Sequence, residues 1–213
     1  MSTQPAPAPL LIACALGIER LALRTGDRSG SGGPVTVLRT GMGPRAAERA
    51  VTRMLADPAL GGAAVLATGF CAGLAPGMHP GDLVVAEETR DPDGTVRCTG
   101  TDLLVKELAR TVPGRTVHRG PVAGSDHVVR GHERADLLAT GAIAVDMESA
   151  ATLLSAVRIA ERPVAAVRVV VDAPEHELVR IGTVRGGISA FRVLRSVLPA
   201  FFDWHRSLLL PRR

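Results

Sequence analysis

Short apolar runs alternate with longer amphipathic stretches along most of this chain. The apolar runs, rich in valine, leucine, isoleucine and alanine, predict buried strands at residues 10–15, 35–39, 63–68, 82–86, 116–122, 142–146 and 164–171. Stretches whose apolar positions lie three or four residues apart predict helices at residues 44–55, 101–111, 149–160 and 187–198. Strands that alternate with helices in this way indicate a single-domain α/β layer fold.

Acidic residues lie where two of the predicted strands end. Asp146 and Glu148 stand at the end of one apolar run, and Asp172 directly follows the next. In α/β sheets, ligands bind in the crevice beyond the carboxyl ends of parallel strands. Because the two strands flank one predicted helix, we expect these carboxylates to converge on a single site.

The composition is that of a globular domain, with 46% hydrophobic and 22% charged residues among 213. Residues 1–9, rich in proline and alanine, predict a disordered tail, and residues 10–213 predict the domain. No apolar run reaches the roughly 20 residues needed to cross a bilayer. The tail also lacks the basic region and apolar core of a secretion signal. We therefore expect a cytoplasmic location.

Charge and cysteine usage exclude several classes of function. The formal net charge of +4 comes from arginine, since Lys106 is the only lysine. Because no basic run is interleaved with aromatic residues, we expect no nucleic-acid partner. Cys14, Cys71 and Cys98 lie far apart and have no histidine at ligand spacing, so neither a disulfide nor a metal site is expected. Cys14 and Cys71 fall in or beside apolar runs, where we expect buried, reduced thiols.

Two glycine-rich turns follow predicted strands, at residues 40–44 and 68–73. Glycine lets the backbone approach a ligand closely, and the N–H groups of such turns can face an anion. Taken alone, both segments are equally well explained as tight turns. Neither is a dinucleotide or Walker motif, which weakens the alternative of an FMN- or nucleotide-binding doubly wound domain.

Residues 67–85 resemble the purine nucleoside phosphorylase and methylthioadenosine nucleosidase superfamily, in which a glycine-rich turn, Gly-Leu-x-Pro and Gly-Asp-hydrophobic-Val mark the nucleoside pocket. Residues 145–151 look like its Val-Glu-Met-Glu ribose motif, and residues 168–172 resemble its Arg-x-x-Ser-Asp motif. Residues 15–19 are similar to the nucleosidase segment that ends in a glutamate. Residues 124–127 look like the strand that feeds the base pocket. The matches keep the family's order over most of the chain.

Within the superfamily, the small size, the opening run and the Val-Asp-Met-Glu-Ser segment look most like the hopanoid-associated phosphorylases. That subgroup is thought to release adenine from adenosylhopane. The resemblance implies a three-layer, phosphorylase-like fold with a central mixed β-sheet flanked by helices, and a homo-oligomer. It implies no cofactor, with phosphate as a possible co-substrate.

The resemblance also implies roles for the acidic residues. Cleaving a purine N-glycosidic bond puts positive charge on the ribose and negative charge on the departing base. Asp172 would be the general acid that protonates or hydrogen-bonds N7, aided by burial at the end of an apolar strand. Glu148 would bind the ribose hydroxyls and stabilise the oxocarbenium ion. Further residues that the resemblance assigns to substrate binding are Met147, Gly69, Phe70, Asp126, His127 and Arg168.

Several of these residues also have a purely structural explanation. Glu148 could be a carboxylate favoured by the dipole of the helix that it precedes. Asp172 could cap the turn that follows it, and Met147 could be an ordinary core residue. Asp126 and His127 could form a simple turn pair.

Arg168 is harder to explain structurally, because a guanidinium inside an apolar strand must be paired. Its expected partners are Asp146, Glu148 and Asp172. Val171 stands where the family usually has a serine before the catalytic aspartate. This substitution removes a hydroxyl near the purine and leaves selectivity for adenine open.

The nucleophile could be water or phosphate. Glu19 matches the glutamate that handles water in the nucleosidases, which favours hydrolysis. Ala67 and Phe70 stand where hexameric phosphorylases carry the arginine and serine that hold phosphate. The candidates for a different phosphate site are Gly43, Arg45 and Arg20.

Residues 191–204 hold three of the four phenylalanines and the only tryptophan, interleaved with arginines. This pattern is typical of a segment at a membrane surface, which would suit a lipid-linked nucleoside substrate. The alternative is a final helix that packs on the core or on a partner subunit.

Three functions remain open from the sequence. The leading hypothesis is an enzyme that releases adenine from adenosylhopane. The nearest alternative is a nucleosidase for methylthioadenosine, S-adenosylhomocysteine or a related small nucleoside. The third is a noncatalytic nucleoside-binding protein on the same fold.

Overall fold

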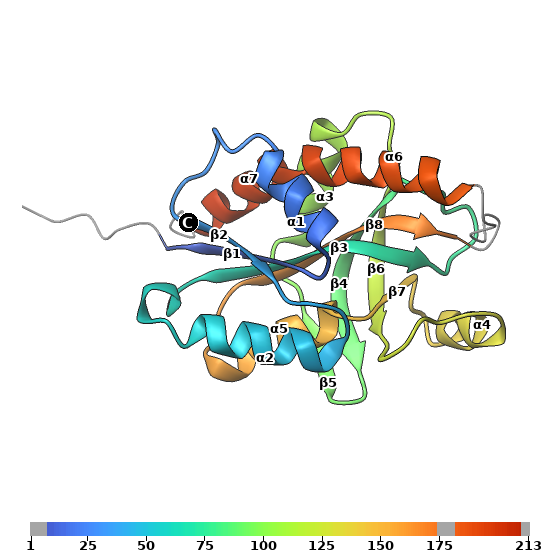
Figure 1. Ribbon diagram of the computed structural model, residues 1–213, viewed down its shortest axis with the longest axis horizontal. Coiled ribbons are helices and arrows are strands. Elements are labelled where there is room, and N and C mark those ends of the chain that lie inside the picture. The colour runs from blue at the N-terminus through green and yellow to red at the C-terminus, as the bar shows by residue number, and fades with distance from the viewer. Residues whose placement is uncertain (1–7, 174–181, 210–213) are drawn as a thin grey trace, which may run out of the picture.

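A computed structural model describes residues 8–173 and 182–209, with only the backbone described at 182–188. The protein folds as an eight-stranded sheet between two layers of helices (Figure 1). The strands are β1 (Leu10–Cys14), β2 (Val35–Arg39), β3 (Ala64–Gly73), β4 (Leu83–Asp91), β5 (Gly94–Arg97), β6 (Val117–Gly124), β7 (Ala144–Asp146) and β8 (Val164–Asp172). The helices are α1 (Gly17–Thr25), α2 (Pro44–Leu55), η1 (Pro58–Leu60), α3 (Thr101–Thr111), α4 (His132–Ala139), α5 (Ser149–Ile159), α6 (Gly182–Ser196) and α7 (Leu198–Leu208).

The sheet is mixed, as the resemblance implied. The strand order is β2-β1-β3-β7-β6-β4-β5, and β8 pairs with both β3 and β4. The pairs of β1 with β2, β1 with β3, β3 with β8, β4 with β6 and β6 with β7 are parallel. Those of β3 with β7, β4 with β5 and β4 with β8 are antiparallel. The pairings of β3, β7, β6, β4 and β8 therefore close on themselves, unlike the open parallel sheet of a doubly wound domain.

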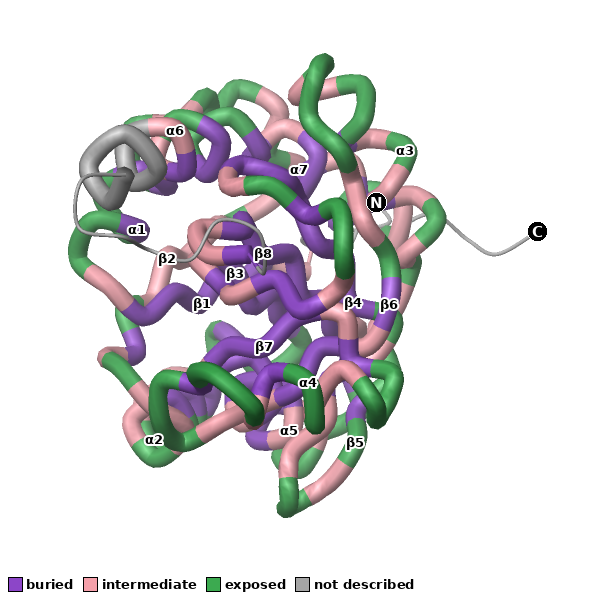
Figure 2. Tube along the Cα trace, turned by 90° about the vertical axis from the view of Figure 1, so that its right-hand side faces the viewer, coloured by how far each residue is buried: buried purple, intermediate pink, exposed green. Residues whose placement is uncertain are grey.

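The two helix layers bury alternate side chains of the same strands. Helices α1, α3, α6 and α7 cover one face of the sheet, and α2 and α5 cover the other (Figure 1). Along β1, Leu10 and Ile12 belong to the first core, whereas Leu11 belongs to the second. This alternation follows from the two-residue period of a strand. The central strands are consequently buried between the layers (Figure 2).

The predicted elements are found in the predicted order. The predictions for β2, α2 and α3 have the observed bounds. Five elements were missed: α1, η1, β5, α4 and α7. Strands β3 and β4 run several residues beyond their predicted ends, so the segment after Thr68 is strand and not turn.

Three of the four C-terminal aromatic residues lie in the core and not at a surface that could meet a membrane. Phe201, Phe202 and Trp204 are each at most 1% exposed and pack with the strands beneath α7. The indole N–H of Trp204 donates a hydrogen bond to the Thr99 carbonyl over 2.7 Å. Burial of these rings stabilises the fold and removes the apolar surface that a bilayer would contact. The alternative, a final helix packed on the core, is confirmed.

None of the described helices combines the length and the hydrophobicity that a membrane span requires. Residues 1–7 of the predicted tail lie outside the described residues. Pro9, its last residue, is already attached to the sheet, because its carbonyl accepts a hydrogen bond from the Ala64 N–H over 3.0 Å.

Candidate active site

A cavity of about 270 Å³ lies where β1, β3, β7 and β8 end. The carboxylates that the sequence placed at strand ends meet here: Glu148 and Asp172 both line the cavity, together with Glu19 from α1. Phe70 and Met147 also line it, as expected for residues that bind substrate. The remaining wall is Ala15, Leu16, Met42, Cys71, Ala72, His127, Val128, Val129, Val145, Asp146 and Val171.

Glu19 is held in one orientation by three backbone N–H groups. Its Oε2 accepts hydrogen bonds from the N–H groups of Ala15 and Leu16 over 2.9 and 2.8 Å. Its Oε1 accepts one from the Phe70 N–H over 2.8 Å. The first two bonds arise because Glu19 stands in the first turn of α1 and reaches back to the unpaired N–H groups before the helix. The third ties this carboxylate to β3, so a 2% exposed charge is satisfied and fixed.

Glu148 stands at the start of α5 but does not cap it. Asp146 caps the helix, because its Oδ1 accepts hydrogen bonds from the N–H groups of Glu148 and Ser149 over 2.8 and 2.7 Å. The Glu148 side chain is thereby left to pair elsewhere, and its Oε1 accepts a hydrogen bond from the Gly43 N–H over 2.8 Å. Burial raises the pKa of Glu148, and the neighbouring Arg168 partly opposes this shift.

Arg168 lies under the site and does not line the cavity, contrary to its assignment to substrate binding. It is 1% exposed, and its Nε forms an ion pair with Asp146 Oδ2 at 2.8 Å. Nε also donates to Ser149 Oγ over 2.7 Å, and Nη1 donates to the Thr68 carbonyl over 3.0 Å. Of the three expected partners, the ion pair is with Asp146. Burial lowers the pKa of Arg168, but Asp146, Glu148 and Glu19 together raise it above its ordinary value.

Gly69 does not line the cavity either, yet its lack of a side chain is essential to the site. A Cβ at this position would lie 2.5 Å from Glu19 Oε1 and 2.8 Å from Arg168 Nη1. Its φ of 137° also disfavours any other residue. Gly69 therefore allows the Glu19 carboxylate and the Arg168 guanidinium to pack directly against β3.

Asp172 has an ion-pair partner that the sequence reasoning missed. Arg134 Nη1 lies 2.8 Å from Asp172 Oδ2, and Nη2 donates to the Gly73 carbonyl over 2.8 Å. The end of an apolar strand is therefore only part of the environment of Asp172, because a guanidinium contacts this carboxyl group directly. Arg134 lies in a polar segment, and nothing in its spacing signals a role. The turn that Asp172 was alternatively expected to cap continues into residues outside the described part of the chain.

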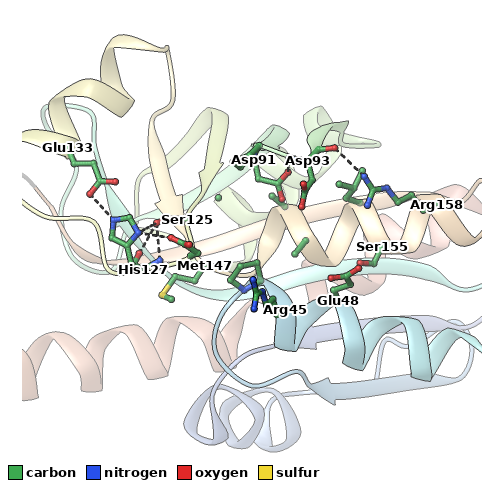
Figure 3. A pocket seen from close by; sticks show the side chains of 17 residues that line it. Arg45, Glu48, Asp91, Asp93, Ser125, His127, Glu133, Met147, Ser155 and Arg158 are labelled. Atoms are coloured by element: carbon green, nitrogen blue, oxygen red, sulfur yellow. Dashed lines mark hydrogen bonds and ion pairs between the residues drawn. The ribbon is translucent and has the colours of Figure 1, made fainter.

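A second cavity of about 410 Å³ adjoins the first and shares His127 and Met147 with it. Figure 3 shows His127 between Glu133 on one side and Ser125 and Met147 on the other, with Arg45 and Glu48 farther along. Asp126 lines this second cavity and not the first. His127 pairs with Asp126 at 2.7 Å and with Glu133 at 3.0 Å, and these two hydrogen bonds raise its pKa.

The three residues proposed for phosphate do not meet at the nucleoside-sized cavity. The Gly43 N–H is already hydrogen-bonded to Glu148. Arg45 lines the second cavity, and Arg20 lines neither of the two. Within residues 8–173 and 182–209, no cluster of histidine, cysteine and acidic side chains could hold a metal ion.

Comparison with known proteins gives a family and a set of similar structures. The profile described as "Phosphorylase superfamily" matches residues 20–198. The 5'-methylthioadenosine/S-adenosylhomocysteine nucleosidase of Neisseria meningitidis is 20% identical with a TM-score of 0.73, over 90% of this chain and 99% of that one. The S-adenosylhomocysteine nucleosidase of Streptococcus pyogenes is 18% identical with a TM-score of 0.76, over 99% of this chain and 100% of that one.

The futalosine hydrolase of Helicobacter pylori is 18% identical with a TM-score of 0.75, over 92% of this chain and 97% of that one. No curated protein sequence matches the chain. The structural likeness confirms the three-layer fold with a mixed sheet, and the family profile spans most of the chain. The chain belongs to the phosphorylase superfamily.

Proposed function

We propose that this protein cleaves the N-glycosidic bond of an adenine nucleoside and that water is the nucleophile. The observation that carries the proposal is the Glu19 carboxylate, which three backbone N–H groups fix at the wall of the same cavity as Glu148 and Asp172. A fixed, buried carboxylate can orient a water molecule and accept its proton. The similar nucleosidase and hydrolase structures support this choice of reaction.

The other two carboxylates divide the remaining chemistry. In this proposal Glu148 accepts hydrogen bonds from the ribose hydroxyls, and its negative charge stabilises the positive charge that develops on the sugar. Met147 packs against the sugar. Asp172 lies at the base, where its protonated form donates a hydrogen bond to N7 and so stabilises the departing purine. Arg168, which is paired with Asp146, also donates a hydrogen bond to Ser149, the first residue of α5.

Charge argues against phosphate as the attacking group. A phosphate dianion beside Glu19 and Glu148 would be repelled unless a cation offset both carboxylates. The buried cation nearest to them, Arg168, is paired with Asp146 and does not line the cavity. Water carries no such penalty, so the site favours hydrolysis.

The rim of the cavity supports an apolar group at the 5′ position of the nucleoside. Met42 and Val128 line the cavity and are 61% and 59% exposed, and Ile18 and Leu21 are exposed on α1. Adenosylhopane and methylthioadenosine both carry apolar 5′ groups, whereas the amino-acid group of S-adenosylhomocysteine is polar. We retain adenosylhopane as the leading substrate and methylthioadenosine as the alternative. With the C-terminal aromatic residues buried, the support for a lipid tail comes from this rim and from the sequence resemblance.

An adenine-release assay on adenosylhopane and methylthioadenosine, each with and without phosphate, tests the proposal. Release that does not depend on phosphate is expected, and Asp172→Asn should abolish it while nucleoside binding persists. Binding of an adenosine analogue without any release of adenine would instead favour the noncatalytic alternative. We also propose a homo-oligomer, which sedimentation equilibrium would test.

A further inference from the structure

Arg134, on α4, carries a buried charge that lies at the ends of two strands. It belongs to none of the motifs identified in the sequence. It is the buried residue of α4 and is 9% exposed. Its guanidinium joins Asp172, at the end of β8, to the Gly73 carbonyl, at the end of β3. These two strands are neighbours, and Ala72 pairs with Asp172 in their register. Arg134 therefore bridges the ends of two neighbouring strands and contacts the cavity residue Asp172 without lining the cavity itself.

The contacts of Arg134 leave one carboxylate oxygen of Asp172 unsatisfied. Oδ2 receives the guanidinium at 2.8 Å. Oδ1 is buried and has no hydrogen-bond partner among the described residues. A buried carboxylate oxygen without a donor is costly, so among the described residues the contact with Arg134 is the one that stabilises this carboxyl group. Asp172 lines the cavity, and because Oδ1 is closed to solvent, the oxygen that a ligand can reach is Oδ2, which Arg134 holds in place.

We infer that Arg134 is a positioning and specificity residue, which orients the Asp172 carboxylate to accept a hydrogen bond from the amino group of a 6-aminopurine. A 6-aminopurine presents N–H donors at this edge, whereas a 6-oxopurine presents a carbonyl oxygen that a carboxylate repels. This role would offset the hydroxyl lost at Val171. The inference rests on the proposed function for its choice of a purine ligand.

A merely structural role is the alternative, since Arg134 also anchors α4 to the sheet. The two explanations differ in what a conservative change should do. If Arg134 orients Asp172, a lysine that retains the charge should preserve the preference for adenine over hypoxanthine. An apolar methionine of similar length should remove that preference even where the protein is fully folded.

Isothermal titration calorimetry with adenine and with hypoxanthine tests the inference on the full chain. Wild type should bind adenine at least about tenfold more tightly than hypoxanthine, and Arg134→Met should erase this ratio. Arg134→Lys should keep it, as should Arg130→Met, a matched change at an exposed arginine near α4. In an Asp172→Asn background, Arg134→Met should change adenine affinity no further, because its effect passes through Asp172.

A folded Arg134→Met protein that keeps the wild-type ratio of adenine to hypoxanthine affinity would overturn the inference. So would a loss of adenine affinity on Arg134→Met that is as large in the Asp172→Asn background as in the wild type. Circular dichroism verifies folding, and Arg134→Gln carries the same prediction if the methionine variant does not fold. Calorimetry measures binding without turnover, so the inference on Arg134 can fail or stand independently of the proposed cleavage reaction. A wild-type preference for adenine without any adenine release would contradict the proposed function and leave this inference standing.

Discussion

The Oε1 atom of Glu148 accepts a hydrogen bond from the Gly43 backbone N–H over 2.8 Å, across 105 residues of sequence. This bond joins the loop before α2 to the start of α5 at the mouth of the cavity. It fixes the carboxylate that we assign to the ribose. It also uses the N–H group that the sequence had suggested for phosphate.

The pH dependence of turnover should report the ionisation of Glu148. Because burial raises the pKa of this group, kcat/KM should fall at a pH above the ordinary glutamate value of about 4.3 as the solution is acidified. Activity is lost on the acid side because the mechanism needs the charged form of Glu148 opposite the developing oxocarbenium ion. Glu148→Gln should lower kcat/KM by roughly 100-fold or more at neutral pH. An unchanged acid limb measured on its residual activity would contradict the assignment.

Gly69→Ala should damage the site because a Cβ would collide with Glu19 and Arg168. A displaced Glu19 carboxylate should lower kcat by roughly 100-fold, as small misplacements of catalytic groups do. Gly114→Ala is a matched control, since its φ is also positive, at 83°, but no atom lies within 4 Å of the added Cβ. Backbone strain should lower the free energy of unfolding of both variants by about 1 kcal/mol. Only Gly69→Ala should lose turnover. Equal kcat values in the two variants would refute the argument.

His205 should make the folded state sensitive to acid. It lies on the buried side of α7, where it is 1% exposed, and burial lowers its pKa. The unfolded chain takes up a proton near pH 6.5, whereas the folded protein does so only at lower pH. The free energy of unfolding should therefore fall as pH drops below about 6.5, by up to about 1.4 kcal/mol per pH unit from this residue.

Urea unfolding of the wild type and His205→Gln between pH 5 and pH 8 measures this contribution. The difference between the two slopes isolates His205 from the carboxylates that titrate in the same range. Parallel stability curves for the two proteins would show that burial of this ring does not govern the acid sensitivity.

The sequence predicted elements whose pattern is set locally and missed those set by tertiary packing. The helix at Pro44–Leu55 was predicted with its observed bounds because a proline starts it and apolar residues repeat along one face. The helix α7 also carries a signal, since Leu198, Phe201 and Phe202 recur at helical spacing. The interleaved arginines left a membrane surface open as a second explanation, and the core contacts of Trp204 favour the packed helix.

The candidate site was predictable to the extent that single residues end apolar strands. Glu148 and Asp172 meet at one cavity, as their positions after successive strands implied. The partner of each charge was not predictable, because pairing depends on side-chain geometry across the sheet. Arg168 pairs with Asp146, whereas Asp172 pairs with Arg134 from a helix that the pattern did not reveal.

The most direct test of hydrolysis is to follow the sugar product in oxygen-18-labelled water, with methylthioadenosine and adenosylhopane as substrates. Mass spectrometry should find the label in a free sugar at the same rate with and without phosphate. Glu19→Gln should abolish that labelled product. A sugar 1-phosphate, formed only when phosphate is present and free of the label, would contradict the account.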